Sequence, residues 1–349
     1  MALLDELSST TDDAFVGFNE ELIKMEYAAA NIFLGDSEEK ADKTIESGNN
    51  LIFDVLYERL GGGWYADYDT FDQAQTERIT QGSVRWGELY VPMQISGSDL
   101  KKNAGMTTRQ LVGQKSLKTI PDRAKNALVS MLNSQIKHAK EDAKHLIAQA
   151  IYSDGSGNSG LQINGFGNII EADTSDFAGI AYTELTAIDK VSQFNTPNYP
   201  WQPKRDHNNG TTRALDWAAI MKMHADVRTG GNAADYVFCD GQMFNAVTSI
   251  AQGENVKTRD NARMADLGFA YIQVVGGPTF VVDDYAPEHK LWWVNTRHMW
   301  MNIHATGWDF SGWKVPTNQN ALIAQLYIML QFICDDRGKQ GLMDDYDPS

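Results

Sequence analysis

The run GSGNSG at residues 155–160 has the spacing of the glycine-rich turn that binds the pyrophosphate of a dinucleotide. Such a turn works when a strand precedes it and a helix follows it, because the helix N–H groups must point at the phosphates. Here the order is reversed, since a long helical pattern precedes the run and a turn-rich segment follows it. We therefore interpret the run as a loop that ends a helix.

Two groups of side chains have the chemistry of metal ligands. Asp283, Asp284 and His289 form one group, and His298 and His304, on one face of a predicted strand, form the other. A hard cation needs several converging oxygen ligands, and a histidine pair needs a third partner. The simpler interpretation of VVDDYAP is a strand that ends in a capped turn, so we expect neither a metal nor another cofactor.

The sequence contains no recognisable signature for nucleophilic catalysis or nucleotide hydrolysis. There is no G-x-S-x-G elbow and no P-loop, and Cys239 and Cys334 lie beside apolar residues, which predicts two buried, reduced thiols. Nine tryptophans and 46 acidic side chains leave a carbohydrate-active enzyme with a carboxylate pair as an alternative. The tryptophans lie in alternating segments, however, where aromatic side chains ordinarily pack in a core or an interface. We expect a protein that is not an enzyme.

Composition and charge argue against two classes of partner, nucleic acids bound tightly and membranes. The 349 residues suffice for a large core, and a formal charge of −16 repels a phosphate backbone, which argues against tight nonspecific binding to DNA. No apolar run approaches the length of a transmembrane helix, and the acidic N-terminus lacks the features of a signal peptide. We expect no contact with a membrane.

The first part of the chain reads as short helices followed by a long β excursion. Apolar residues at three- and four-residue spacing predict amphipathic helices in residues 15–27 and 45–56. The glycines at 61–63 end the helical pattern, and alternating aromatic residues over 64–95 predict extended arms. Within the last arm, residues 87–96, Tyr90 and Pro92 point away from the apolar face, and a proline there predicts an edge strand.

The longest helix is predicted over residues 120–152, where one apolar stripe runs through the whole segment. At 1.5 Å per residue such a helix is about 45 Å long, which suits an extended subunit better than a compact enzyme. A turn-rich α/β segment follows, with helices predicted in residues 213–231 and 241–253 and a strand at 235–241. Strands are then predicted in residues 270–284, 290–304 and 320–336.

This order of elements resembles the major capsid proteins of tailed double-stranded DNA bacteriophages, which share the Hong Kong 97-type fold. Local sequence adds to the resemblance. The stretches similar to family motifs are RWGELYVPMQISGSDLKKNAG (85–105), AIYSDGSGNSGLQINGFGNII (150–170), LWWVNTRHMWMNIHATGWDF (291–310) and DDRGKQGLM (335–343). The resemblance as a whole covers roughly residues 50–345.

The resemblance implies an α+β Hong Kong 97-type capsid fold built from four named parts. These are an N-terminal arm (N-arm, 1–55), an extended β loop with its return strand (E-loop, 56–105), a P-domain (106–155 and 280–349, with a spine helix at about 120–152) and an α/β A-domain (156–279). Contacts between subunits are expected from the E-loop and the N-arm. The expected contact residues are Phe15, Phe18, Trp64, Tyr65, Tyr68, Trp86, Tyr90 and Pro92.

The resemblance also implies a function and partners. The chain is expected to self-assemble into hexamers and pentamers that form the icosahedral head of a virion, assembled in the host cytoplasm around double-stranded DNA that it contacts weakly and nonspecifically. Further partners would be a portal and a decoration protein. A capsid chain that begins at Met1 has lost no N-terminal scaffolding segment, so we expect assembly with a separate scaffold or with none. An encapsulin-like shell around protein cargo is the alternative with the same fold.

Overall fold

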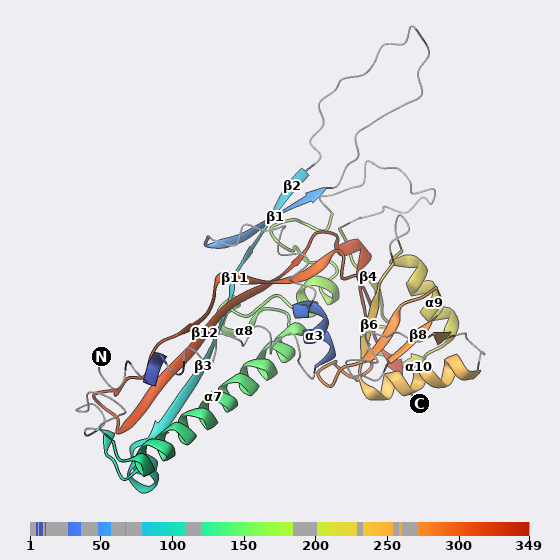
Figure 1. The fold of residues 1–349 in the computed structure, drawn as a ribbon. Coiled ribbons are helices and arrows are strands. Elements are labelled where there is room, and N and C mark those ends of the chain that lie inside the picture. The colour runs from blue at the N-terminus through green and yellow to red at the C-terminus, as the bar shows by residue number, and fades with distance from the viewer. Residues whose placement is uncertain are drawn as a thin grey trace.

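The computed structural model describes residues 5, 7–9, 11, 27–35, 48–56, 67, 79–108, 110, 120–183, 201–228, 233–253, 258–259, 271–274 and 276–348. Within these ranges the chain forms an elongated lobe, a compact lobe joined to it, and a two-stranded hairpin above both (Figure 1). The mixture of helices and sheets confirms the predicted α+β class.

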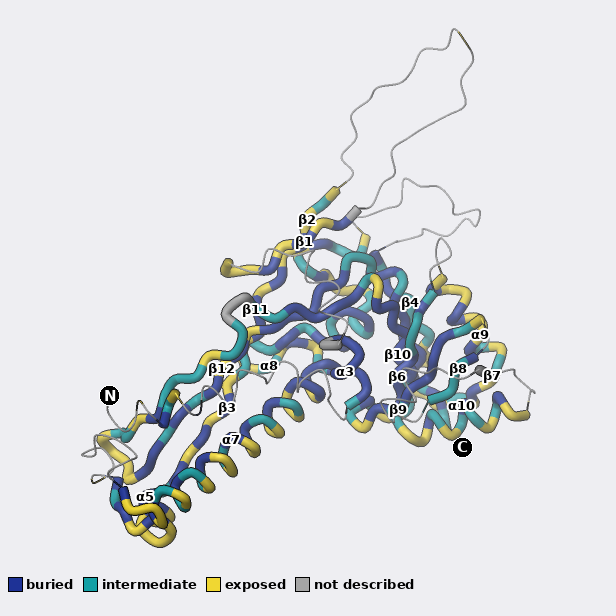
Figure 2. The backbone as a smooth tube through the Cα atoms, viewed as in Figure 1, coloured by how far each residue is buried: buried dark blue, intermediate teal, exposed yellow. Residues whose placement is uncertain are grey.

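The elongated lobe packs one long helix on a three-stranded antiparallel sheet. Helix α7 (Asp122–Ile151) contacts strand β3 (Gly87–Ser96), and the sheet continues through β12 (Ala321–Cys334) to β11 (Met299–Phe310). The helix predicted over residues 120–152 is therefore confirmed, and its buried stripe faces the sheet in Figure 2. The stripe comprises Ala124, Leu128, Leu132, Ile136, Ala139, Ala143 and Ile147.

The compact lobe is built on a seven-stranded mixed sheet with two helices packed on it. Helices α9 (Trp217–Asp226) and α10 (Gly241–Gly253) confirm the two helices predicted in this part of the chain, and β6 confirms the predicted strand. Asp216 caps α9 by accepting a hydrogen bond from the Ala219 N–H at 2.6 Å. In sheet order the strands are β4 (Lys204–Asp206), β13 (Gly341–Met343), β10 (Leu291–Val294), β6 (Tyr236–Cys239), β9 (Thr279–Val282), β8 (Tyr271–Val274) and β7 (Thr258–Arg259).

Alternate residues of this sheet enter two different cores. Cys239, Leu291 and Trp293 pack in a core with α9 and α10, whereas Phe238 and Trp292 belong to the large core of the elongated lobe. The period-two alternation of strands makes this division possible. The large core therefore extends from the elongated lobe onto one face of the seven-stranded sheet, and the smaller core lies on the other face.

The hairpin corrects one prediction. Residues 45–56 were expected to be helical, but Asn50–Leu56 forms strand β1, which pairs antiparallel with β2 (Ile79–Arg85). Leu51 and Phe53 are buried while Ile52 between them is exposed, and this is the period of a strand. The boundary at residue 55 between N-arm and E-loop also falls inside β1.

A second correction concerns residues 290–304, which were predicted as one strand. The chain forms β10 in the compact lobe, turns at residues 295–298, and continues as β11 in the elongated lobe. Strands β10 and β13 both lie in the seven-stranded sheet, so the region 280–349 contributes to both lobes.

The glycine-rich run at residues 155–160 follows α7 directly, as the interpretation of a helix-ending loop requires. Within its short turn α8 (Gly157–Gly160), Asn158 and Ser159 have φ angles of 50° and 60°. A single turn with left-handed backbone is not a helix that could bind a pyrophosphate. The remaining described elements are α3 (Ala28–Gly35), α5 (Gly97–Asp99), η2 (Leu100–Ala104), η4 (Gly167–Glu171), β5 (Arg213–Ala214), η5 (Arg337–Lys339) and β14 (Tyr346–Asp347).

Candidate subunit-contact surface

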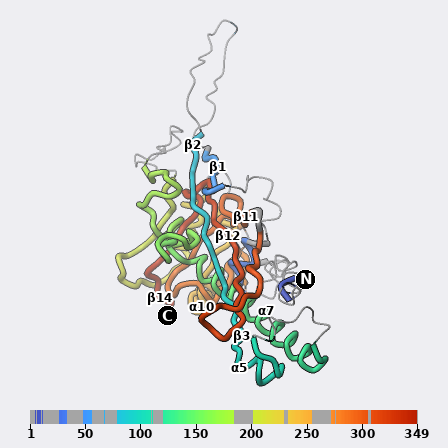
Figure 3. Tube along the Cα trace, turned by 90° about the vertical axis from the view of Figure 1, so that its left-hand side faces the viewer, coloured from blue at the N-terminus to red at the C-terminus, as the bar shows by residue number. Residues whose placement is uncertain are grey.

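Strand β3 is an edge strand, as predicted from Pro92. It pairs with β12 on one side and is the last strand of the three-stranded sheet. Figure 3 shows β2 running on into β3 along the length of the molecule, so one extended segment serves the hairpin and then this sheet. An edge strand carries backbone groups that another chain could pair with, and a proline limits such pairing.

The face of this sheet that points away from α7 carries large apolar side chains. Tyr90 of β3 is 59% exposed and lies opposite Tyr327 of β12, which is 39% exposed. Met329, the next outward residue along β12, is 38% exposed and lies opposite Glu88. We call Tyr90, Pro92, Tyr327 and Met329 the tyrosine face.

The hairpin has its own exposed apolar residues. Ile52 is 57% exposed and Ile79 is 58% exposed, while Leu51, Phe53 and Val55 on the opposite side of β1 are buried. The buried side lies against the chain near residue 178, because a Cβ atom at Gly82 would lie 3.1 Å from the Ala178 Cβ. Ser83 of β2 also donates its N–H to the Ala178 carbonyl at 2.9 Å. A hairpin fixed in this way keeps its outer side available for another surface.

The structure places the predicted contact residues in different environments. Tyr90 and Pro92 are exposed on the tyrosine face. Trp86, by contrast, is only 4% exposed and packs edge-on against His304 with ring centroids 5.2 Å apart. Trp86 lies between β2 and β3, where the chain passes from one sheet to the next, so it belongs to the core of the subunit itself. Phe15, Phe18, Trp64, Tyr65 and Tyr68 lie outside the described residues.

The residues considered as metal ligands have separate structural roles. Asp283 accepts N–H groups from Ala29 at 2.8 Å and Tyr285 at 2.9 Å, and His289 Nδ1 contacts the Tyr346 carbonyl at 2.8 Å. His298 pairs with Asp335, whereas His304 packs on Trp86. In the described part of the chain no three His, Cys, Asp or Glu side chains are placed to bind a metal ion together.

Both cysteines are buried and free. Burial raises the pKa of Cys239, whose thiol lies 3.8 Å from the Val281 carbonyl, and it also raises the pKa of Cys334. Neither thiol is therefore a ready nucleophile at neutral pH.

None of the helices in the described ranges is long and apolar enough to cross a membrane.

A group of polar side chains to which the sequence analysis gave no structural role holds the crossing between the lobes. The chain passes from β10 to β11 and returns from β12 to β13, and the two passages lie against each other. The Gln340 side-chain oxygen accepts the Asn295 N–H at 2.7 Å, and the Gln340 amide group donates to the Asn295 carbonyl at 3.3 Å. His298 Nδ1 lies 2.9 Å from Asp335, and the Lys339 ammonium lies 2.9 Å from His298 Nε2.

Arg337 holds a second connection beside this crossing. Its guanidinium is fully buried and donates to the carbonyls of Ile169 at 2.9 Å, Ser175 at 2.9 Å and Ala172 at 3.0 Å. Burial lowers its pKa to about 10, so the group stays charged at neutral pH. These charge-assisted bonds stabilise η4 and the turn-rich segment that follows it.

Comparisons with known proteins give structural matches. No known protein family matches the chain by sequence, and no curated protein does. The capsid protein in the asymmetric unit of the cyanophage A-1(L) capsid is similar with a TM-score of 0.60 at 13% identity, over 87% of this chain and 90% of that one. The capsid proteins of the native and the empty GTA particle are similar with TM-scores of 0.51 and 0.50 at 10% and 11% identity, covering 86% and 87% of each chain.

This chain has the phage capsid fold, of the Hong Kong 97 type.

Within the capsid fold, three of the four stretches that resemble family motifs gather around the crossing, and the fourth, residues 85–105, forms β3, α5 and η2 of the elongated lobe. Residues 291–310 supply β10, Asn295 and β11, and residues 335–343 supply Arg337, Gln340 and β13. Residues 150–170 supply the end of α7 and the start of η4, which Arg337 binds. These stretches therefore build the connection between the lobes.

Proposed function

We propose that this protein is a major capsid subunit that self-assembles into hexamers and pentamers of an icosahedral phage head around double-stranded DNA. The observation that carries the proposal is the capsid fold over most of the chain, together with an exposed tyrosine face on its edge-strand sheet. A monomer seldom leaves several large apolar side chains adjacent and exposed, and such a patch commonly marks an interface. The role is structural and not catalytic.

Under this proposal, each capsid domain corresponds to one of the sheets or helices described above. We assign α3 to the N-arm, β1 and β2 to the E-loop, the elongated lobe to the P-domain with α7 as the spine helix, and the compact lobe to the A-domain. The A-domain then includes β10 and β13, which come from the last quarter of the sequence.

The contact between subunits would join the hairpin of one copy to the tyrosine face of another. Ile52 and Ile79 provide apolar side chains on the hairpin, and Tyr90, Tyr327 and Met329 provide them on the sheet. Pro92 limits uncontrolled strand addition at this edge, which favours one defined pairing. Many copies of a modest contact stabilise a closed shell, because each added subunit is held by several neighbours.

The charge of the chain suits a container. A formal charge of −16 disfavours tight binding of a phosphate backbone, so packaged DNA would move along the wall with weak, nonspecific contacts. A portal, a separate scaffold and a decoration protein are partners that a head of this kind would use. Tight binding of purified shells to duplex DNA at physiological salt would contradict this part of the proposal.

The decisive experiment is expression of the chain alone, followed by light scattering and negative-stain microscopy. Closed shells or rings hundreds of ångströms across are expected, with a scaffold supplied if none form. A second variant, Ile52→Ser combined with Ile79→Ser, removes the exposed apolar side chains of the hairpin; it should fold and fail to assemble. Shells of normal size from this variant would refute the proposed contact, and a small monodisperse species under every condition would refute a shell function.

A further inference from the structure

Helix α3 is buried on every described side, which is unusual for an eight-residue helix near the start of a chain. Ala28, Ala29, Ala30, Ile32 and Phe33 are all within the large apolar core. A helix that is apolar all round is normally a central element of a fold. Here it belongs to neither sheet and lies between α7 and the compact lobe (Figure 1).

The N-terminal end of α3 is attached to both lobes. Towards the compact lobe, the buried Asp283 carboxylate accepts the Ala29 N–H at 2.8 Å, and Tyr27 packs edge-on against Tyr285 at 5.0 Å. Towards the elongated lobe, the Tyr27 hydroxyl lies 2.7 Å from His145 Nδ1 on α7. Asp283 follows β9 directly, so this attachment joins the helix to the seven-stranded sheet.

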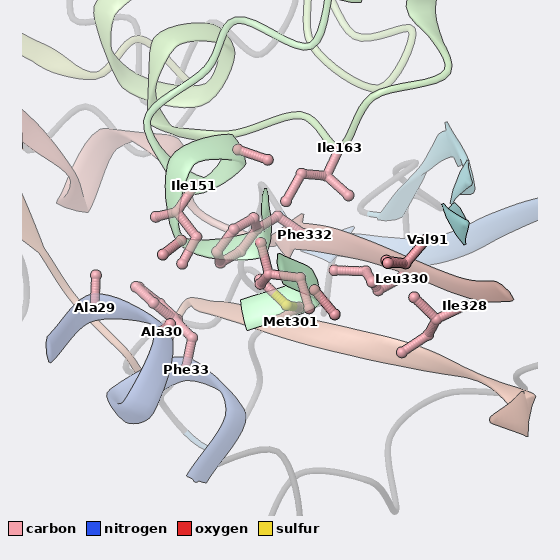
Figure 4. Packing of buried hydrophobic residues seen from close by; sticks show 14 of the residues in the cluster. Ala29, Ala30, Phe33, Val91, Ile151, Ile163, Met301, Ile328, Leu330 and Phe332 are labelled. Carbon is pink, nitrogen blue, oxygen red and sulfur yellow. The ribbon is translucent and has the colours of Figure 1, made fainter. Parts of the chain in front are cut away.

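The later part of α3 is attached to both lobes a second time, through Phe33. Its ring packs edge-on against Phe332 of β12 at 5.0 Å, and it lies 6.2 Å from the ring of Phe238 of β6. Phe166, between α8 and η4, completes the cluster at 5.7 Å. Figure 4 shows Phe33 beside Phe332 and Met301, with Ala29 and Ala30 on the same helix.

We propose that α3 is a wedge that fixes the angle between the two lobes and thereby the curvature of the shell. The two chain segments that connect the lobes, from β10 to β11 and from β12 to β13, run side by side at the crossing. By themselves they would allow the lobes to rotate about this point. The attachments at Tyr27 and Phe33 are separated by six residues, about 9 Å of helix, and each contacts both lobes. Two separated contacts on each lobe oppose a rotation that one contact would permit.

The curvature part of this inference rests on the proposed shell function, but the wedge itself does not. We would measure the distance between spin labels on Ser134→Cys of α7 and Ser249→Cys of α10, both exposed positions, by pulsed electron resonance. Labelled chain is diluted with unlabelled chain, so that only distances within one subunit are recorded. The native cysteines are buried and will not compete for the label.

Two wedge variants are compared with a matched control. Phe33→Leu removes the ring contacts, and Asp283→Asn weakens the attachment at the start of α3 while keeping its shape. Phe280→Leu is the control, because Phe280 is equally buried but packs on Trp293 inside the compact lobe alone. Should Phe33→Leu fail to fold, Asp283→Asn still tests the inference.

We expect a shifted and broader distance distribution in both wedge variants and the wild-type distribution in Phe280→Leu. Identical distributions in all chains, or equal broadening in the control, would overturn the wedge. Where shells form, the wedge variants should also give a wider range of diameters, and unchanged diameters despite broadened distances would overturn the link to curvature. Broadened distances in a chain that never assembles would support the wedge and count against the shell function.

Discussion

The side chain of Gln340 exchanges two hydrogen bonds with the backbone of Asn295, so that an amide group takes the place of a neighbouring strand at the crossing between the lobes. Both residues are fully buried, and Asn295 uses its own side chain to donate to the Ala233 carbonyl. At this buried point of the crossing the polar groups of Gln340 and Asn295 therefore satisfy one another.

Replacing Gln340 by alanine should destabilise the subunit by about 1–3 kcal/mol, because it leaves a buried N–H and a buried carbonyl without their partner. Chemical denaturation followed by tryptophan fluorescence measures the change. Gln94→Ala, at an exposed position of β3, is the control and should change the free energy of unfolding by less than about 0.5 kcal/mol. Equal effects of the two substitutions would show that the Asn295 contact adds nothing.

Arg337→Met should cost about 3–5 kcal/mol, since several buried carbonyls lose a charged donor at once. Arg85→Met provides the comparison. The Arg85 side chain is 60% exposed, and its ion pair with Glu88 is long, at 3.9 Å. The free energy of unfolding should therefore fall by less than about 1 kcal/mol. Denaturation midpoints of the two variants and the wild type measure these losses of stability. A midpoint for Arg337→Met near that of the wild type would contradict the stabilising role of the guanidinium.

Asp283 should make stability depend on pH. Burial raises the pKa of its carboxyl, and the N–H groups of Ala29 and Tyr285 oppose that rise only in part. Between the ordinary pKa of the unfolded chain, about 3.9, and the raised value, the folded state keeps a proton that the unfolded state has released. The free energy of unfolding therefore falls as pH rises through this window.

Asp283→Asn cannot titrate and isolates this effect. The free energy of unfolding of the wild type, minus that of the variant, should be largest below the ordinary pKa, decrease as pH rises, and become constant above the raised pKa. Urea denaturation from about pH 3 to pH 8 measures the difference. A difference that increases with pH would mean that the folded protein favours the ionised carboxylate.

The double substitution Tyr90→Ala and Tyr327→Ala should separate folding from assembly. A cross-strand pair on an exposed face is worth roughly 0.2–1 kcal/mol, so the subunit should still fold. Light scattering should show lost or strongly slowed assembly. Met221→Ala removes a side chain of similar exposure, 40%, from α9 and should assemble normally. Normal assembly of the double variant would exclude the tyrosine face as a contact surface.

Predictions from the sequence were confirmed where local pattern decides the structure. The stripe of α7 and the alternation in residues 87–96 depend only on neighbours in the chain, and Tyr90 and Pro92 were placed on the exposed face from that alternation alone. Residues 50–56 fit a helical period equally well by their apolar letters. Pairing with β2, more than twenty residues later, made them a strand.

The parts that could not be predicted depend on distant partners. The strand ends at Val294 in a turn in which Asn295 Oδ1 accepts the Arg297 N–H at 3.1 Å, but the distant partners Gln340 and Asp335 that hold this turn between the lobes cannot be seen in the local sequence. Tyr327 and Met329 were not identified as surface residues, since β12 is apolar on both faces and reads as a buried strand. Tyr327 and Met329 can be recognised as surface residues only when β12 is known to pair with β3, which places them on the exposed face beside Tyr90.

The pairing of β3 with β12 also sets the earliest point during translation at which the three-stranded sheet can form. These strands are more than 220 residues apart, so the ribosome must finish almost the whole chain before the sheet can close. At a bacterial rate of about 5–20 residues per second, that delay is roughly 10–50 seconds. Until then neither tyrosine has its neighbour. If the tyrosine face is the subunit contact that we propose, nascent chains on one messenger cannot join through it before they are complete.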